Sequence, residues 1–171
     1  MEKIKIYLSG PDRLKKDAEE LFKKKKELCE KYGFELLEYP QDLYKAKDSL
    51  ENNERIAKQR LELIRECDVL IADTIDFRSF LEPYSESAFE LGIGFGLFKK
   101  LYCYMPDTRL CHERYSGTKT LKDGKSYVDE NGIGFEPGPV NLMLEYGAKL
   151  VKGDLEDALK TVAADFGKGW K

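Results

Sequence analysis

Short apolar runs alternate with longer polar segments along the chain, and this alternation leaves few folds open. Five runs have the length of a strand, at 4–8, 34–39, 69–72, 101–105 and 149–151. The run Val69-Leu70-Ile71-Ala72 is apolar throughout, which is typical of a strand buried on both faces of a parallel sheet. Strands that alternate with helices form βαβ units, so the sequence predicts an α/β fold with helices on both faces of the sheet.

The segments between the runs predict where helices lie. Apolar residues recur at helical spacing in four segments, at about 14–33, 56–67, 87–98 and 154–166. Gly33 stands where a C-cap glycine would end the first helix. We therefore expect a doubly wound, flavodoxin-like three-layer sandwich with a five-stranded parallel sheet, in a single domain over residues 1–171.

Two segments lack the regular spacing of apolar residues that is typical of a buried helix or strand face. Residues 41–53 are expected to form a polar loop. Residues 106–139 are expected to form a long loop or lid, with a hairpin turn at 122–125, because excursions of that length are usually functional or mobile.

The composition excludes several classes of site. The chain has one histidine, His112, so a site with two histidine ligands cannot form within it, and we expect His112 on the surface of the long loop. The four cysteines show no Cys-x-x-Cys spacing, which indicates reduced thiols in a cytoplasmic protein. A net charge of −3 and the lack of a long apolar stretch predict no nucleic-acid or membrane partner.

In doubly wound folds, ligands bind beyond the carboxyl ends of the strands. The residues expected at that edge are Ser9, Gly10 and Pro11 after the first strand and Asp73 after the third. The turn at 9–13, Ser9-Gly10-Pro11-Asp12-Arg13, opens a helical segment, whose free N–H groups could hold an anion. The alternative is a purely structural turn with Asp12 as the helix N-cap.

A glycine cluster at 92–96 is similar to a dinucleotide-binding fingerprint, but its context differs. It lies inside a helical pattern and not in the first strand-to-helix turn. We interpret Gly92, Gly94 and Gly96 as positions of close helix packing.

Three carboxylates at the start of the third expected helix are the strongest candidates for chemistry. Glu82, Glu86 and Glu90 fall within nine residues near the predicted cleft. A carboxylate that attacks an anomeric carbon forms a covalent sugar ester, which is how glycosyl transfer proceeds with retention. The alternative is a capping box, in which Glu90 reaches back to the N–H of Ser87 at the helix N-cap.

The chain resembles the nucleoside 2-deoxyribosyltransferase family from Ile56 to Leu144. The family has a strand that ends in Ala-Asp or Ala-Asn, then a Phe-Arg loop, then Glu-Pro-Asp-x-Gly-Thr-Ala-Phe-Glu-x-Gly. The corresponding segments here are 67–73, Phe77-Arg78 and 82–92. The opening segment 5–11 is similar to the family's first strand, and 139–143 resembles its later Pro-x-Asn-Leu-Met segment.

The resemblance implies roles for particular residues. Glu90 matches the nucleophile that attacks C1′ of the deoxyribosyl group, and Tyr7 matches the tyrosine that orients it. Asn141 and Met143 match a segment that reaches into a neighbouring subunit's site, which implies a homo-oligomer. No metal or organic cofactor is expected. The expected substrate-binding residues are Ser9, Gly10, Pro11, Asp73, Phe77, Tyr84, Glu86, Asn141 and Met143.

The chain departs from the family pattern at three positions. Tyr84 replaces the aspartate of Asp-x-Gly-Thr, and Glu86 replaces its glycine. Because tyrosine is a poor general acid, the proton would come from Glu82, Glu86 or Asp73. Arg60 stands where relatives have an acidic or amide residue; it either favours a negatively charged ligand such as a nucleotide phosphate or is a solvated helix arginine.

The sequence thus predicts an N-deoxyribosyltransferase-like enzyme that cleaves 2′-deoxynucleosides through a deoxyribosyl-Glu90 intermediate and passes the sugar to another nucleobase. Two alternatives remain open. One is an N-glycosidase that hydrolyses nucleoside 5′-monophosphates on the same fold. The other is a nucleotide-binding module that has lost catalysis. The expected partners are nucleosides or nucleotides, nucleobases and further copies of the chain.

Overall fold

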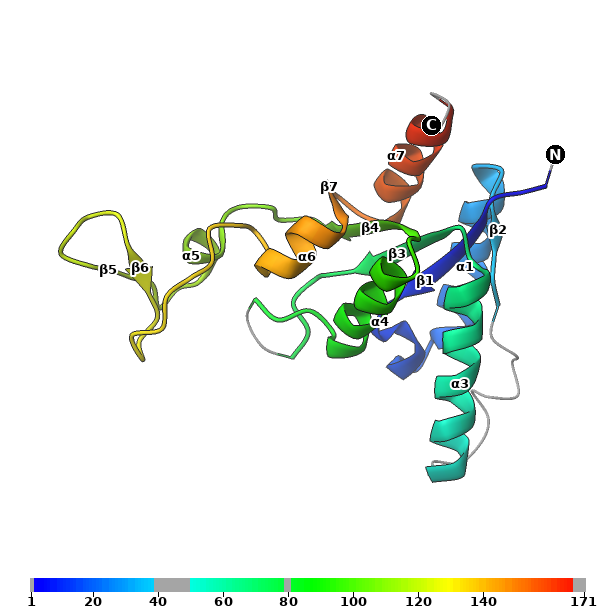
Figure 1. The fold of residues 1–171 in the computed structure, drawn as a ribbon, viewed down its shortest axis with the longest axis horizontal. Helices are drawn as coiled ribbons and strands as arrows, with labels where there is room; N and C mark the ends of the chain where they lie inside the picture. The colour runs from blue at the N-terminus through cyan, green and yellow to red at the C-terminus, as the bar shows by residue number, and fades with distance from the viewer. Residues whose placement is uncertain (1, 39–49, 79–80, 168–171) are drawn as a thin grey trace.

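The computed structural model describes residues 2–38, 50–78 and 81–167. Five parallel strands form one sheet in the order β2-β1-β3-β4-β7, which confirms the predicted flavodoxin-like arrangement (Figure 1). The strands are β1 (Lys5–Ser9), β2 (Glu35–Leu36), β3 (Val69–Asp73), β4 (Lys100–Met105) and β7 (Lys149–Lys152). The expected strand end at Pro40 and most of the expected loop at 41–53 lie outside the described residues.

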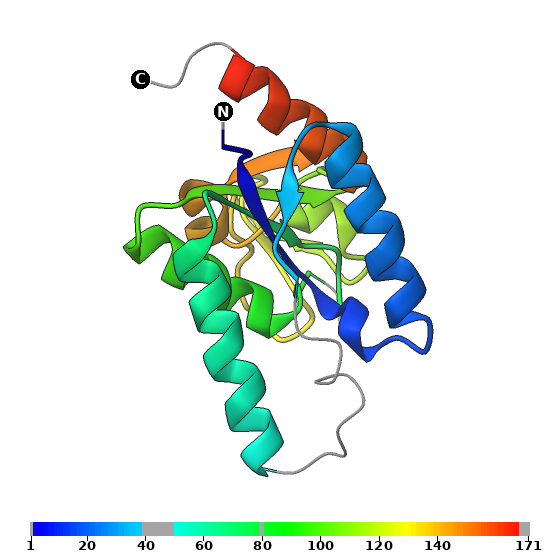
Figure 2. The same cartoon turned by 90° about the vertical axis from the view of Figure 1, so that its right-hand side faces the viewer.

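Helices cover both faces of the sheet and complete the expected three-layer sandwich (Figure 2). One face carries α1 (Ala18–Lys31) and α7 (Leu155–Gly167). The other carries α3 (Leu50–Glu66), α4 (Ser85–Gly96) and the short α6 (Leu142–Gly147). Within the described ranges, no helix has both the length and the apolarity that a membrane crossing requires.

Successive side chains of β1 point to opposite faces of the sheet, so alternate residues meet the layer formed by α3 and α4. Ile6 packs in the core cluster with α1 and α7, whereas Tyr7 packs in the opposite cluster with Leu70 and Leu91. Ser9, two residues after Tyr7, faces the same side. The hydroxyl groups of Tyr7 and Ser9 therefore lie beneath α3 and α4.

The structure corrects the predicted helix boundaries. A 3-10 turn, η1 (Pro11–Leu14), follows β1, so α1 begins at Ala18 and not near residue 14. Residues 50–53 belong to α3 and not to the expected loop. The helix α4 begins two residues earlier than predicted and ends at Gly96. Gly33 has φ = +83°, as a C-cap glycine requires, so that prediction is confirmed.

The glycines of α4 differ in their packing. A Cβ on Gly94 would lie 2.8 Å from Leu101 Cδ2, so this glycine lets the helix approach β4 closely. Added Cβ atoms on Gly92 and Gly96 would meet no atom of the described residues within 4 Å. The close-packing interpretation is confirmed for Gly94 and wrong for the other two.

Residues 106–139 leave the sheet as an arm that projects away from the body, on the side opposite α3 (Figure 1). The arm contains α5 (Cys111–Arg114) and a hairpin of β5 (Lys119–Thr120) and β6 (Tyr127–Val128). The predicted hairpin turn is confirmed, with Gly124 at φ = +68°. The ring of His112 stacks on that of Tyr127 at 3.8 Å. A role of the arm as a lid stays a prediction.

Candidate active site

Glu90 is a buried carboxylate held by three donors. Tyr7 donates its hydroxyl to Oε1 at 2.7 Å, and Ser9 donates to Oε2 at 2.5 Å. The Nε of Arg60 lies 2.6 Å from Oε1. Only 4% of Glu90 is exposed, and burial of a charge at this level requires such pairing. The carboxylate therefore has one fixed orientation.

The local sequence explains how these groups meet. Tyr7 and Ser9 occupy alternate positions on β1, and Glu90 is on the face of α4 that packs against them. Ser87, one turn before Glu90, lies on the same face, with its hydroxyl 3.0 Å from that of Ser9. Each side chain is thus placed by the periodicity of its own element.

The capping-box interpretation of Ser87 and Glu90 is wrong. Because α4 begins at Ser85 with Tyr84 as its N-cap, Ser87 lies inside the helix. Its backbone N–H donates to the Tyr84 carbonyl at 2.9 Å. The Glu90 carboxylate is left free to turn toward the sheet.

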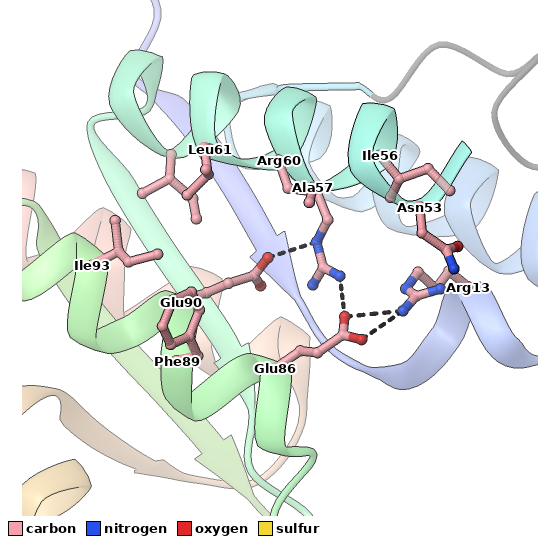
Figure 3. Close-up of a pocket in the computed structure, with 11 residues that line it drawn as sticks. Arg13, Asn53, Ile56, Ala57, Arg60, Leu61, Glu86, Phe89, Glu90 and Ile93 are labelled. Carbon is pink, nitrogen blue, oxygen red and sulfur yellow. Dashed lines mark hydrogen bonds and ion pairs between the residues drawn. The ribbon is translucent and has the colours of Figure 1, made fainter. Parts of the chain in front are cut away.

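A chain of four alternating charges runs from Arg13 through Glu86 and Arg60 to Glu90 (Figure 3). Arg13 Nη2 donates to both oxygens of Glu86, at 2.7 and 3.0 Å, and to the Tyr84 hydroxyl at 2.9 Å. Arg60 Nη1 also donates to Oε2 of Glu86. Arg60 is 8% exposed, so the interpretation as a solvated helix arginine is wrong.

Hydrogen bonding controls the protonation of this cluster. Burial alone would raise the pKa of Glu86, but hydrogen bonds from Tyr84, Arg13 and Arg60 outweigh it and lower that pKa to about 2. Burial and the Glu86 carboxylate raise the pKa of Tyr84. At neutral pH, Glu86 is therefore an anion and Tyr84 a neutral phenol.

The Glu90 carboxylate faces a cavity of about 420 Å³ between α3 and α4. This volume is in the range of sites for small organic ligands. Arg13, Arg60, Glu86 and Glu90 supply its polar groups. The remaining lining residues are mostly apolar: Asn53, Ile56, Ala57, Leu61, Ile64, Phe89 and Ile93. The cavity thus combines an apolar wall with a charged floor.

The carboxyl edge of the sheet holds two more of the predicted residues. A Cβ on Gly10 would lie 3.1 Å from Asp73 Cβ, so the ends of β1 and β3 approach closely there. Burial raises the pKa of Asp73, whose carboxylate accepts a hydrogen bond from the N–H of Ile75 at 2.9 Å. Pro11 opens η1, of which Gly10 is the N-cap, so the expectation of Asp12 as N-cap is wrong.

Phe77 and the predicted Pro-x-Asn-Leu-Met segment lie outside this cluster. Phe77 packs edge-on against Tyr84, with ring centroids 4.9 Å apart. Asn141 caps α6 by accepting from the Met143 N–H at 2.9 Å. Met143 is exposed and lines a groove beside α4, not the Glu90 cavity. Within one described chain, Asn141 and Met143 are therefore not part of the site.

Sequence reasoning gave no role to the side chain of Arg13 and missed Ser87 and the apolar wall. The wall could have been found from the spacing of Ala57, Leu61 and Ile64 on one face of α3, since residues three, four and seven apart share a helix face. No local pattern indicates the contact of Arg13, because its partner Glu86 is 73 residues away. Among the described residues, no group of His, Cys, Asp and Glu side chains is arranged to hold a metal ion.

Comparison with known proteins gives one family. Residues 6–149 match the family described as nucleoside 2-deoxyribosyltransferase. No curated protein matches the sequence significantly.

Three solved structures show how widely the fold is shared. A 2-deoxyribosyltransferase from Leishmania mexicana is 29% identical, with a TM-score of 0.68 over 94% of this chain and 97% of its own. A CMP N-glycosidase from Clostridium botulinum is 11% identical, with a TM-score of 0.51 over 92% and 97%. A conserved protein from Enterococcus faecalis V583 is 13% identical, with a TM-score of 0.53 over 99% and 100%. The last two show the fold alone.

Proposed function

The chain belongs to the nucleoside 2-deoxyribosyltransferase family, and on this premise we propose that it transfers the deoxyribosyl group of a 2′-deoxynucleoside to a second nucleobase. The observation that carries the proposal is the Glu90 carboxylate, buried beside a cavity and oriented by Tyr7, Ser9 and Arg60. A nucleophile fixed in this way meets C1′ without reorganisation, which lowers the entropic part of the barrier.

In the first step, an oxygen of Glu90 attacks C1′ and the bond from C1′ to the base nitrogen breaks. The electron pair of that bond leaves with the base, which takes up a proton. The product is a deoxyribosyl ester of Glu90. Tyr7 and Ser9 hold the carboxylate in line, and Arg60 balances its charge before the attack.

Asp73, beside Gly10 where β1 and β3 end, is proposed as the proton donor to the leaving base. Of the three carboxylates considered from sequence, Glu86 has a pKa of about 2 and is deprotonated at neutral pH, and Glu82 is exposed. Burial raises the pKa of Asp73, which is the direction that a general acid needs. Tyr84 keeps its proton through its hydrogen bond to Glu86.

In the second step, a nitrogen of the acceptor base attacks C1′ and loses its proton, and the ester bond breaks to restore the Glu90 carboxylate. Two inversions at C1′ give net retention. If water replaces the acceptor base, the same intermediate gives free deoxyribose, which is the N-glycosidase alternative.

Replacement of Glu90 tests the proposal. Glu90→Gln keeps the side-chain volume but removes the nucleophile, so transfer should fall by a factor on the order of 10³ or more. Circular dichroism should show an unchanged fold. Glu62→Ala, which changes an exposed carboxylate on α3, is the matched control and should keep full activity. Undiminished transfer in Glu90→Gln would contradict the assignment.

A product assay separates transfer from hydrolysis. A deoxynucleoside or its 5′-monophosphate is incubated with and without an excess of a second base, and the exchanged product and the free deoxyribose or its 5-phosphate are measured. Transfer predicts new nucleoside as the main product when the acceptor is abundant, whereas hydrolysis predicts deoxyribose in both arms. Calorimetric binding with no product and no adduct would favour the module that has lost catalysis.

The protein is further proposed to act as a homo-oligomer through α4 and α6. Five apolar side chains on these helices are more than half exposed: Phe89, Phe95, Leu142, Met143 and Tyr146. Exposed apolar patches of this kind mark association surfaces. In such an assembly, Asn141 and Met143 would approach a neighbour's cavity. Light scattering should give a dimer or larger species, and Tyr146→Glu should shift it toward monomer; a monomeric wild type would contradict the proposal.

The remaining expectations are kept as part of the proposal. Residues 1–171 are taken as one domain of this family, with the arm at 106–139 as its lid. A cytoplasmic location is supported by the four cysteines, which are free buried thiols. Fractionation of cells that make the protein tests the location.

A further inference from the structure

Glu86 fills the space between two guanidinium groups in the cavity that Glu90 also lines (Figure 3). We propose that Glu86 is a built-in anion in the place where the 5′-phosphate of a nucleotide would bind, so that the site takes 2′-deoxynucleosides and rejects their 5′-monophosphates. The inference rests on the proposed function, because it names the substrate class of the same cavity.

The contacts of Glu86 are those of a bound anion. Both of its oxygens accept from Arg13 Nη2, and Arg60 Nη1 also donates to one of them, Oε2. Two arginines that converge on one group form a geometry suited to phosphate as well as to carboxylate. The Nε of Arg13 is shielded from solvent and has no hydrogen-bond partner among the described residues, so the subsite has a further donor to offer.

The spacing of Glu86 and Glu90 along α4 places the proposed phosphate subsite beside the 5′ end of a bound sugar. Glu86 and Glu90 are four residues apart, and side chains at that spacing are neighbours with Cβ atoms about 5–6 Å apart. That separation is comparable to the span of a deoxyribose from C1′ to its 5′ oxygen. A sugar with C1′ at Glu90 can therefore place its 5′ end beside Glu86 and Arg13.

The charge balance argues against a phosphate in the wild-type site. Arg13 and Arg60 carry two positive charges, and Glu86 and Glu90 carry two negative charges, so the cluster is neutral before a ligand enters. A 5′-phosphate would bring further negative charge against Glu86. Repulsion of a wrong partner by a fixed like charge is a common source of specificity.

A phosphate does not displace Glu86 easily, for two reasons. Glu86 is tethered to α4, so it competes at a high effective concentration for both arginines. Its pKa of about 2 keeps it charged over the whole range in which nucleotides are stable, so protonation does not vacate the subsite. The neutral 5′-hydroxyl of a nucleoside needs no such displacement.

The test combines turnover with direct binding. For wild type, Glu86→Gln, Glu86→Ser and the double variant Arg13→Gln/Glu86→Gln, kcat/KM is measured on one 2′-deoxynucleoside and on its 5′-monophosphate. Binding of inorganic phosphate is followed by calorimetry and by the shift in Tm, against chloride at equal ionic strength. Glu156→Gln is the matched control, because Glu156 also accepts hydrogen bonds from a cation, Lys31, and from a phenol, Tyr32, but lies on α7.

We expect wild type and Glu156→Gln to favour the nucleoside and to show no stabilisation by phosphate. The Glu86 variants should raise the ratio of monophosphate to nucleoside kcat/KM at least about tenfold and should bind phosphate. The double variant should lose that gain, since Arg13 is the cation set free.

Several results would overturn the proposal. Folded Glu86 variants with neither phosphate binding nor a changed ratio would do so. A wild type that prefers the monophosphate would overturn it even if no Glu86 variant folds. If wild type turns over neither substrate, the proposed function fails, and phosphate binding to Glu86→Gln still decides the inference.

Discussion

Neutralising Glu86 should weaken the fold in a way that depends on pH. In the folded protein the pKa of Glu86 is about 2, compared with an ordinary value of 4.5, because Tyr84, Arg13 and Arg60 donate to the carboxylate. Folding therefore favours the ionised form of Glu86. Glu86→Gln keeps the shape of the side chain and removes this preference.

The magnitude follows from the two pKa values. At about 1.36 kcal/mol for each pH unit between them, the upper limit is about 3.4 kcal/mol. The Glu86 side chain is 39% exposed, so solvent screening reduces the figure, and we expect a loss of about 1–2 kcal/mol at pH 7. For a domain of this size that loss lowers Tm by about 2–8 °C.

The sign of the pH dependence is fixed by the direction of the pKa change. A carboxylate whose folded pKa is depressed contributes stability above its unfolded pKa and loses it as pH falls through the folded value. The difference between wild type and Glu86→Gln should be constant above about pH 6 and should shrink between about pH 4.5 and pH 2. Urea denaturation at a series of pH values measures it.

Glu156→Gln again serves as the control for a carboxylate outside the cavity. Its carboxylate is paired at the surface, where ion pairs contribute little, so its effect on unfolding should be smaller than that of Glu86→Gln. A difference for Glu86→Gln that stays constant down to pH 3, or that grows as pH falls, would refute the electrostatic reasoning.

Four further substitutions test the packing and chemistry around the site. Tyr7→Phe, which removes one donor to the Glu90 carboxylate, should lower kcat by about 10–100-fold without loss of the fold, as steady-state kinetics would show. Gly94→Ala should lower the free energy of unfolding by about 1–3 kcal/mol because its Cβ would meet Leu101, whereas Gly92→Ala should leave it unchanged or raise it. Asp73→Asn should slow base departure but should not lower stability at neutral pH, because burial raises the pKa of Asp73 and its ionised form costs stability above that value.

The fold was predictable because each strand carries its own signal. The run Val69-Leu70-Ile71-Ala72 is fully buried, as its composition requires, and the remaining runs take up the expected order in the sheet. Helix starts were less predictable. Leu14 fits the apolar spacing of the first helix, but it lies in the 3-10 turn Pro11–Leu14. Spacing alone does not separate such a turn from the helix that follows.

The site was predictable only where a residue's neighbours are fixed by the sheet. Tyr7 and Ser9 share one face of β1, and both hydroxyls donate to Glu90. The resemblance implied this contact for Tyr7 alone, whereas Ser9 was expected to bind substrate. The choice between a nucleophile and a capping box depended on whether α4 starts at Ser85 or at Ser87. Because it starts at Ser85, Ser87 lies inside the helix and does not cap it.

Contacts between segments that lie far apart in the sequence could not be predicted from it. The direction of Arg60 depends on which face of α3 packs on the sheet, and its two carboxylate partners come from another helix. Arg13 reaches Glu86 only because η1 turns the chain back toward α4. The roles proposed for Asn141 and Met143 require a second copy of the chain, so they rest on the proposed oligomer.

Trapping the deoxyribosyl ester of Glu90 tests whether this residue becomes covalently bound to the sugar. The protein is mixed with a 2′-deoxynucleoside in the absence of acceptor base, quenched in acid, digested and analysed by mass spectrometry. We expect one deoxyribosyl group on the peptide that contains Glu90 in wild type, and none in Glu90→Gln. Turnover of the nucleoside with no adduct on that peptide, or with an adduct on another residue, would contradict it.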